Sequence, residues 1–250
     1  MLFDWIRGKS TTKEKIQQDF SFLSTDMHSH LIPGIDDGSD SPETSVKLVQ
    51  HLYDLGFRKL ITTPHVMIDH YPNTTDSITK GFAVLKAAVE AAQIPVELGF
   101  AAEYYMDEVF EKKLGVEPLL TISDNKILVE MSFMAAPRNL QQIIFKIRTQ
   151  GYKPVLAHPE RYVFWANDFE QFENLKELGC DFQLNLLSIL GYYGKASRDL
   201  GLKFLDAGMI NLVGTDLHHE RHAKALQDLS KDNKLMKILA NQPNLYNLSL

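Results

Sequence analysis

Strand-like apolar runs alternate with longer amphipathic segments along most of this chain of 250 residues, and this alternation restricts the fold more than any other feature. The runs predict strands at Asp26–His30, Lys59–Thr63, Val96–Ala102, Lys126–Ser132, Pro154–Ala157, Phe182–Leu187 and Ile210–Gly214. Helical periodicity lies between them, at Pro42–Leu55, Asp76–Gln93, Asp107–Lys113, Asn139–Gln150, Phe169–Leu178, Ala196–Ala207 and Arg221–Leu239. Strands that alternate with helices are typical of a parallel sheet, and about seven of them at this length favour an α/β barrel in one domain.

The composition is that of an ordinary soluble globular protein, with 44% hydrophobic and 23% charged residues. The formal net charge of -6 disfavours nucleic acid as the main partner, because phosphate backbones require a basic face. Cys180 is the one cysteine, so no internal disulfide forms and a cytoplasmic location is expected. No apolar run approaches the roughly 18 residues of a membrane span, and the N-terminus lacks a signal-peptide pattern, so an integral membrane protein is not expected.

Residues 1–24 precede the first strand signal, and we expect them to form an N-terminal extension to a domain at residues 25–250. The extension carries the apolar residues Leu2, Phe3, Trp5 and Ile6 before a polar, lysine-containing stretch. Two interpretations stay open: a segment that packs on the domain or frays, and a short amphipathic segment that docks on a partner or a membrane surface.

Histidine and acidic residues recur at the ends of the predicted strands. His28 and His30 are two residues apart on an extended segment, so their imidazoles project from the same face and can share a metal ion. In a parallel barrel the functional residues lie where strands end. Later strand ends carry His65, Glu103, His158, Asp216 and His218, and the loop after the first strand carries Asp36 and Asp37.

Imidazole and carboxylate donors without thiolate suit manganese, iron or zinc. The set exceeds the three or four ligands of a single catalytic zinc, which indicates two or three divalent ions with Glu103 as a possible bridge between two of them. Each residue also has a structural alternative: a helix N-cap for Asp36 or Asp37, a rim salt bridge for Glu103, and a hydrogen-bonded loop position for His65.

Clustered ions suit hydrolysis of a phosphate ester, because they stabilise charge on the oxygens of a transferring phosphoryl group. Arg161 follows His158 by three residues, and its guanidinium can hold two phosphate oxygens or form a structural ion pair with a loop acid. Aromatic residues near the strand ends either stack on a substrate ring or pack the rim. Cysteine-based tyrosine phosphatases are excluded, because Leu186 stands where their Cys-x5-Arg motif would place arginine after Cys180.

Six motifs together resemble the polymerase-and-histidinol-phosphatase (PHP) superfamily: Asp26-Met27-His28-Ser29-His30, Asp36-Asp37-Gly38, Thr63-Pro64-His65, Ala102-Glu103-Tyr104, His158-Pro159-Glu160-Arg161-Tyr162 and Asp216-Leu217-His218. Within it they are similar to the bacterial manganese-dependent protein-tyrosine phosphatases that regulate capsular and exopolysaccharide synthesis. The resemblance implies a distorted seven-stranded barrel with a site for two to three ions. Manganese is the expected metal, with iron, cobalt or zinc as alternatives. The implied substrate is phosphotyrosine on a membrane-associated bacterial tyrosine kinase.

The resemblance also implies residue roles. One ion would be held by His28, His30, Glu103 and Asp216, a second by Glu103, His65 and His158, and a third by Asp37 and His218. Arg161 and Asp37 would be catalytic, and the substrate would contact Arg161, Tyr104 and Tyr162. Two alternatives remain: a PHP-type small-molecule phosphatase, such as one for histidinol phosphate, and a non-catalytic metal-stabilised binding module.

Overall fold

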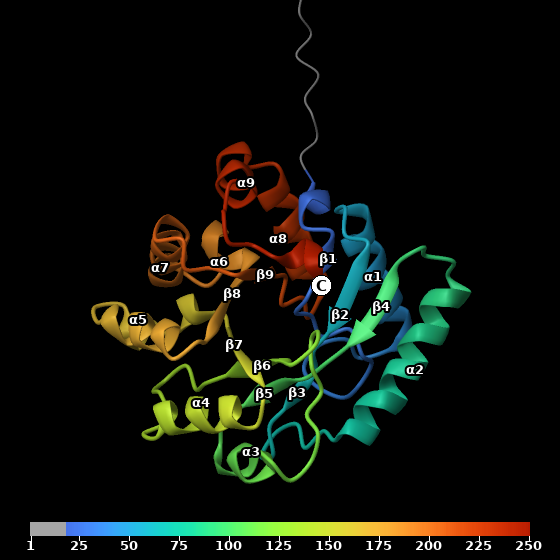
Figure 1. Ribbon diagram of the computed structural model, residues 1–250. Helices are drawn as coiled ribbons and strands as arrows, with labels where there is room; N and C mark the ends of the chain where they lie inside the picture. Colours follow the sequence, from blue (N-terminus) through green and yellow to red (C-terminus); the bar gives the residue numbers. More distant parts are fainter. Residues whose placement is uncertain (1–18) are drawn as a thin grey trace, which may run out of the picture.

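The computed structural model describes residues 19–250 as a single-domain α/β fold with parallel sheets and helices around the outside of the strands (Figure 1). Within these residues there are nine strands, β1 (Thr25–Asp26), β2 (Lys59–Thr62), β3 (His65–Val66), β4 (Glu97–Phe100), β5 (Glu103–Tyr105), β6 (Lys126–Glu130), β7 (Lys153–Ala157), β8 (Asp181–Asn185) and β9 (Leu212–Gly214). They form a three-stranded sheet in the order β1-β2-β4 and a six-stranded sheet in the order β3-β5-β6-β7-β8-β9. Every pairing between these strands is parallel.

Two short strands that the sequence did not predict, β3 and β5, follow directly after predicted ones, which is why nine strands are found where seven were expected. Strand β2 ends before Thr63 and Pro64, because proline has no N–H for a ladder hydrogen bond. Strand β3 begins at His65. Residues 101–102 likewise separate β4 from β5. Backbone bonds bridge both breaks, since Ala101 donates to Thr62 at 2.9 Å and Glu103 donates to Pro64 at 3.1 Å.

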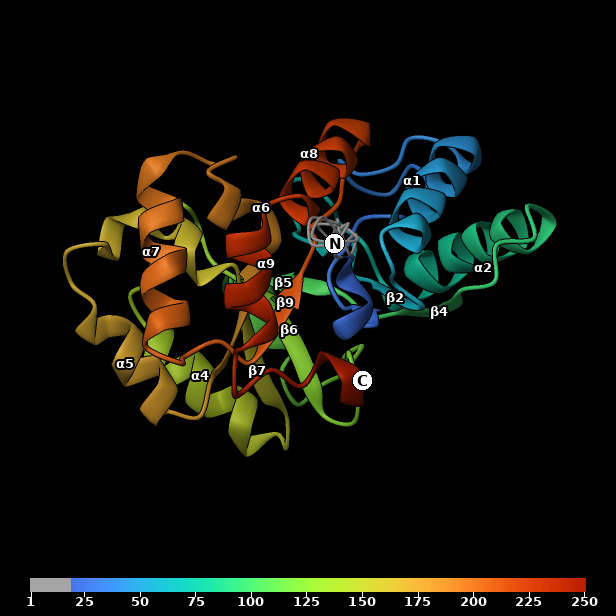
Figure 2. The ribbon, with the colours of Figure 1, turned by 90° about the horizontal axis from the view of Figure 1, so that it is seen from above.

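The described part of the chain also contains nine α-helices, namely α1 (Pro42–Asp54), α2 (Thr75–Ala91), α3 (Glu108–Lys113), α4 (Leu140–Thr149), α5 (Glu170–Glu177), α6 (Leu186–Leu190), α7 (Lys195–Asp206), α8 (Glu220–Ser230) and α9 (Asn233–Ala240). Helices α1 and α2 pack side by side along one side of the molecule, away from α5 and α7 (Figure 2).

Two sequence predictions were wrong about where an element ends, one for a helix and one for a strand. The single helix expected at 221–239 is two helices, because the Asp232 side chain accepts hydrogen bonds from the backbone N–H groups of Lys234 and Leu235 and starts α9. The strand expected at 182–187 ends at Asn185, whose side chain accepts from the N–H of Leu187 and caps α6.

Packing extends into the predicted N-terminal extension. Phe20 is fully buried, its ring stacks on Phe57 with centroids 5.5 Å apart, and its N–H donates to the carbonyl of Leu55. Residues 19–24 are therefore part of the folded domain. The apolar residues Leu2 to Ile6, for which docking was considered, lie outside the described residues. None of the described helices combines the length and apolarity needed to cross a bilayer.

Candidate metal centre

The structure brings together all eight side chains that the sequence nominated as metal ligands. They come from distant points of the chain: His28 and His30 after β1, Asp37 in the loop before α1, His65 on β3, Glu103 at the start of β5, His158 after β7, and Asp216 and His218 after β9. Because the strands are parallel, all of these positions lie at one end of the sheets.

Glu103 is the centre of the cluster. Its Oε2 atom lies 3.1 Å from Nε2 of His28 and 3.2 Å from Nδ1 of His65. Its Oε1 atom lies 3.1 Å from Nε2 of His158. The Glu103 side chain is fully buried, and its carboxylate contacts three nominated ligands that follow or lie on three different strands.

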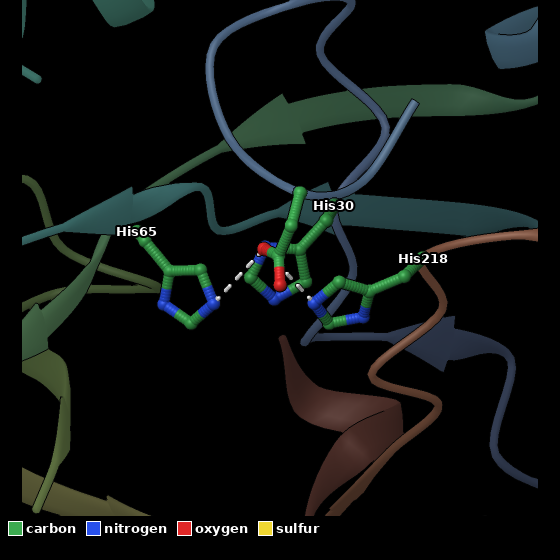
Figure 3. Close-up of side chains that lie close together, drawn as sticks. His30, His65 and His218 are labelled. Atoms are coloured by element: carbon green, nitrogen blue, oxygen red, sulfur yellow. Dashed lines mark ion pairs between the residues drawn. The ribbon is translucent and has the colours of Figure 1, made fainter. Parts of the chain in front are cut away.

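A second group surrounds Asp37, a half-exposed residue on the outer side of the cluster. Asp37 Oδ1 lies 3.5 Å from Nε2 of His65 and 3.5 Å from Nε2 of His218. Figure 3 shows the imidazoles of His65 and His218 on either side of this carboxylate, with His30 beside them. The donor atoms of His30, Asp37, His65 and His218 all lie within 4.8 Å of one another.

Asp36 and Asp37, which the sequence left as alternatives, have different positions. Asp36 Oδ2 lies 2.8 Å from Nδ1 of His30 and therefore orients that imidazole, whereas Asp37 faces the cluster directly. Their loop can come this close to His30 because Gly38 has no side chain: a Cβ there would lie 2.2 Å from the carbonyl oxygen of His30.

The ring nitrogens of His28 and His30 fit a cation between them. Nδ1 of His28 bonds to Oε1 of Gln183 at 2.8 Å, and Nδ1 of His30 bonds to Asp36. These acceptors hold the Nδ1 protons, so an ion that displaces the Nε2 protons would meet two lone pairs, and the two Nε2 atoms face each other at 3.3 Å. Ligands with bonds of about 2.1 Å to one ion lie about 3.0 to 3.4 Å apart, so this spacing suits a shared metal.

The electrostatics of the cluster also favour cations. Burial by itself would lower the pKa of His28, but Glu103 and Asp216 raise it to about 9. Burial would raise the pKa of Glu103, yet the neighbouring His28 and His65 hold it well below its usual range. The carboxylates are therefore ionised and demand positive charge, which protons on the imidazoles or metal ions can supply.

Two of the nominated ligands, His158 and Asp216, occupy strained backbone positions. His158 has a φ of 35° and Asp216 a φ of 49°, both in the left-handed region that non-glycine residues seldom adopt. Such conformations cost on the order of 1–3 kcal/mol each and persist where the surroundings impose them, which is common at functional sites.

Arg161 lies at the edge of the same cavity. Its Nη1 donates to Oδ2 of Asp216 at 3.1 Å, and its guanidinium packs over the rings of Phe133 and Tyr193. The cavity has a volume of about 230 Å³, and its lining includes His65, His158 and Asp216. Arg161 thus has donors available beside the proposed ligands.

The two tyrosines for which the resemblance implied substrate contact, Tyr104 and Tyr162, lie outside the lining of this cavity. Both rings are buried, and their hydroxyls accept hydrogen bonds from the backbone N–H groups of Leu120 and Met131, respectively. Neither ring lines the cavity beside Arg161. The two aromatic residues that do line it within the described chain are Phe133 and Tyr193.

Sequence reasoning missed one further member of the cluster, Glu130. Glu130 ends β6, and its Oε1 lies 3.0 Å from Nδ1 of His65. An acid at the end of an apolar run was the available signal, the same one that identified Glu103. Two amides on β8 also contact the cluster: Gln183 Oε1 bonds to Nδ1 of His28, and Asn185 donates to Asp216, both at 2.8 Å.

Comparison with known proteins gives consistent matches. A family model described as "Capsular polysaccharide synthesis, CpsB/CapC" matches residues 24–236. Tyrosine-protein phosphatase YwqE of Bacillus subtilis is 29% identical over 195 residues, which cover 78% of this chain and 77% of YwqE. Tyrosine-protein phosphatase CpsB of Streptococcus agalactiae is 26% identical over 200 residues, covering 78% of this chain and 82% of CpsB.

Solved structures show the same fold. A structure described among "YwqE from Bacillus subtilis and CpsB from Streptococcus pneumoniae, unique metal-dependent tyrosine phosphatases" has a TM-score of 0.76 at 24% identity, covering 89% of this chain and 96% of that chain. A lactonase from Listeria monocytogenes has a TM-score of 0.52 at 12% identity, covering 92% of each chain.

Proposed function

From the premise that this chain belongs to the capsular polysaccharide synthesis CpsB/CapC family, we propose that it is a metal-dependent protein-tyrosine phosphatase. The observation that carries the proposal is the single cavity in which Arg161 adjoins a cluster of imidazoles and carboxylates. Related proteins named tyrosine-protein phosphatases support the reaction class.

The ligand distances support a division among three ions that differs in part from the one the resemblance implies. The first ion would be held by His28, His30, Glu103 and Asp216. The second would share Glu103 and add Glu130 and His158. The third would be held by Asp37, His65 and His218. Imidazole and carboxylate donors suit manganese, and iron, cobalt or zinc are the alternatives.

When bound, divalent ions supply Lewis-acid stabilisation of phosphoryl oxygens and lower the pKa of water. The chain itself would bind the phosphate through the guanidinium of Arg161, whose position is held by Asp216 and by the two flanking rings. Gln183 and Asp36 would keep the ring nitrogens of His28 and His30 directed at the ions. Asp37 lies at the rim, where it can orient the attacking water.

The proposed substrate is phosphotyrosine on a protein, with a membrane-associated tyrosine kinase of capsule or exopolysaccharide synthesis as the partner. The relatives named for tyrosine-protein phosphatase activity support the substrate class. The cavity volume of about 230 Å³ lies below the roughly 300–1,000 Å³ of pockets that enclose a whole small molecule, and it suits one side chain presented by a larger partner.

We also propose that the two sheets together make a distorted seven-stranded barrel, with β2 and β3 as one strand and β4 and β5 as another. Pairing between the first and last strand segments supports closure, since Ser29 and Leu217 form a parallel bridge. A separate cluster of buried apolar side chains from β2, β6, β7 and β9 and their flanks supports an enclosed interior.

The test compares substrates on the metal-loaded enzyme. A phosphotyrosine peptide should be hydrolysed, chelation should abolish the activity, and Mn²⁺ should restore it. Faster turnover of histidinol phosphate with little activity on the peptide would favour the small-molecule phosphatase. Metal binding without hydrolysis of either ester would favour a binding module, and activity in fully demetallated protein would refute the proposed mechanism.

A further inference from the structure

Phe133 is an exposed apolar residue in a cavity otherwise lined mainly by charged and imidazole side chains. It follows β6 in the loop that leads to α4, and 42% of its surface is exposed. The guanidinium carbon of Arg161 lies 4.2 Å from the centre of its ring, and the His158 ring centroid lies 5.5 Å away. Phe133 therefore adjoins both the expected phosphate position and a proposed metal ligand.

Tyr193, the other aromatic lining residue, is tied into the protein. Its hydroxyl accepts from Nδ2 of Asn185 at 3.3 Å, and its ring packs at 4.3 Å against the same guanidinium. It is half-buried, whereas Phe133 exposes a larger apolar surface and has no polar group to keep in water. Of the two rings, Phe133 is the one available to an incoming apolar group.

When Arg161 binds the phosphate of an ester, the rest of the substrate lies beside the rings of Phe133 and Tyr193. A phenyl ester would place its ring beside Phe133, where aromatic contact and burial both favour binding. An alkyl ester such as phosphoserine offers one methylene at that position and gains little.

We propose that Phe133 is the residue that makes this site select aryl over alkyl phosphate monoesters. The proposal deepens the proposed phosphatase function and rests on it. Phe133 forms the apolar wall against which the phenyl ring of phosphotyrosine packs, while Arg161 and the metal centre hold the phosphate.

A purely structural role for Phe133 would change the ligand affinities in a different way. If the ring served only to position Arg161, its removal would weaken every phosphate ligand alike, including inorganic phosphate. If the ring contacts the substrate, its removal weakens only ligands that carry an aromatic group. The two roles are therefore separated by comparing ligands rather than by comparing activities.

The experiment measures calorimetric binding of phenylphosphonate, methylphosphonate and inorganic phosphate to the Mn²⁺-loaded protein. These ligands are not hydrolysed, so the result does not depend on turnover. The wild type should bind phenylphosphonate about tenfold more tightly than methylphosphonate, a ratio expected from ring contact and burial. Phe133→Ala should abolish the ratio with less than a twofold change for inorganic phosphate, and Phe133→Tyr should preserve it.

Met134→Ala is the matched control, because Met134 is the adjacent residue, is 85% exposed and does not line the cavity. It should leave all three affinities unchanged. An equal loss for all three ligands in Phe133→Ala would assign Phe133 to positioning Arg161, and an unchanged ratio would show that the phenyl ring binds elsewhere; either result overturns the proposal. Absence of hydrolysis with the binding ratio intact would instead count against the proposed function alone.

Discussion

Asp26 on β1 accepts two hydrogen bonds from Thr215, a residue 189 positions later in the chain. The backbone N–H of Thr215 donates to Oδ1 and its hydroxyl donates to Oδ2, both at 2.8 Å. These bonds join the first strand to the segment after β9, and they set His28 and Asp216 beside each other, with His28 Nε2 3.4 Å from Asp216 Oδ1. One buried carboxylate thus aligns the two ends of the domain at the candidate metal centre.

Asp26→Ala should lower the free energy of unfolding by roughly 2–4 kcal/mol, because it removes two buried hydrogen bonds and leaves the N–H of Thr215 without its acceptor. Asp26→Asn should lose less, since its amide oxygen can still accept from the N–H and the Thr215 hydroxyl can turn to accept from the amide. Urea unfolding measures both. Asp206→Ala, at an exposed position at the end of α7, is the control and should change stability by less than about 0.5 kcal/mol. Equal stability of Asp26→Ala and the wild type would refute the conclusion that Asp26 holds the two ends of the domain together.

Glu103→Gln should reduce the number of tightly bound ions and the increase in melting temperature that Mn²⁺ produces. Gln keeps the shape but removes the negative charge and one of two coordinating oxygens. Elemental analysis of the dialysed protein measures the ion content. Glu108→Gln, on the exposed start of α3, should bind as many ions as the wild type. Full metal content in Glu103→Gln would remove Glu103 from the centre of the cluster.

Metal affinity should rise with pH. The metal-free cluster holds His28 at a pKa of about 9, chiefly through Glu103 and Asp216 against the opposing effect of burial. Below that pKa an ion must displace the proton, so the affinity falls as the pH falls. Mn²⁺ titrations at pH 6 and pH 8, in buffers with different ionisation enthalpies, would detect the released protons. An affinity that does not depend on pH would contradict this protonation of the metal-free site.

Arg161→Lys should reduce kcat/KM for a phosphotyrosine peptide by about 10- to 100-fold, the loss expected when charge-assisted hydrogen bonds to phosphate are weakened by roughly 1.5–3 kcal/mol. Lysine keeps the positive charge but cannot donate in parallel to two oxygens. The ion content should stay that of the wild type, because Arg161 donates to Asp216 and ligates no ion in the proposed arrangement. Kinetics and elemental analysis on the same sample decide this, and unchanged kinetics would exclude the phosphate-binding role.

Glu160 should make the protein less stable as the pH rises from about 4.5 to 7. Burial raises its pKa from 4.5 to about 7, although Ser188 and the Asn185 N–H donate to it. In this window the unfolded chain releases the proton while the folded chain keeps it, so the free energy of unfolding falls, by up to about 3 kcal/mol.

Glu160→Gln should remove that part of the pH dependence, which urea unfolding at pH 5 and pH 8 would measure. The variant should therefore gain stability relative to the wild type at the higher pH. The exposed Glu170→Gln is the control and should follow the wild-type curve. Parallel curves for Glu160→Gln and the wild type would show that the buried carboxyl does not titrate in this range.

Local sequence determined most of the elements. Helix α1 begins at the expected place, because Ser41 accepts from the N–H of Thr44 and Pro42 occupies the first turn, both local interactions that the sequence encodes directly. Strand β6 begins where its apolar run begins, because consecutive apolar residues are buried on both faces of a parallel sheet. The sequence also nominated the residues of the candidate site, since polar groups that follow apolar runs meet at one end when parallel strands lie side by side.

Tertiary structure alone decided what each side chain contacts. Whether Asp36 or Asp37 faces the cluster depends on how closely a loop approaches His30, and the burial of Tyr104 and Tyr162 depends on backbone groups that lie 16 and 31 residues away from them in the chain. Phe133 lies beside Arg161 because the loop after β6 contacts the short 3-10 helix Pro159–Arg161 that follows β7. Periodicity specifies the face of a strand or helix on which a residue lies, but the distance between two side chains is set by packing among segments far apart in the chain, and no local pattern encodes it.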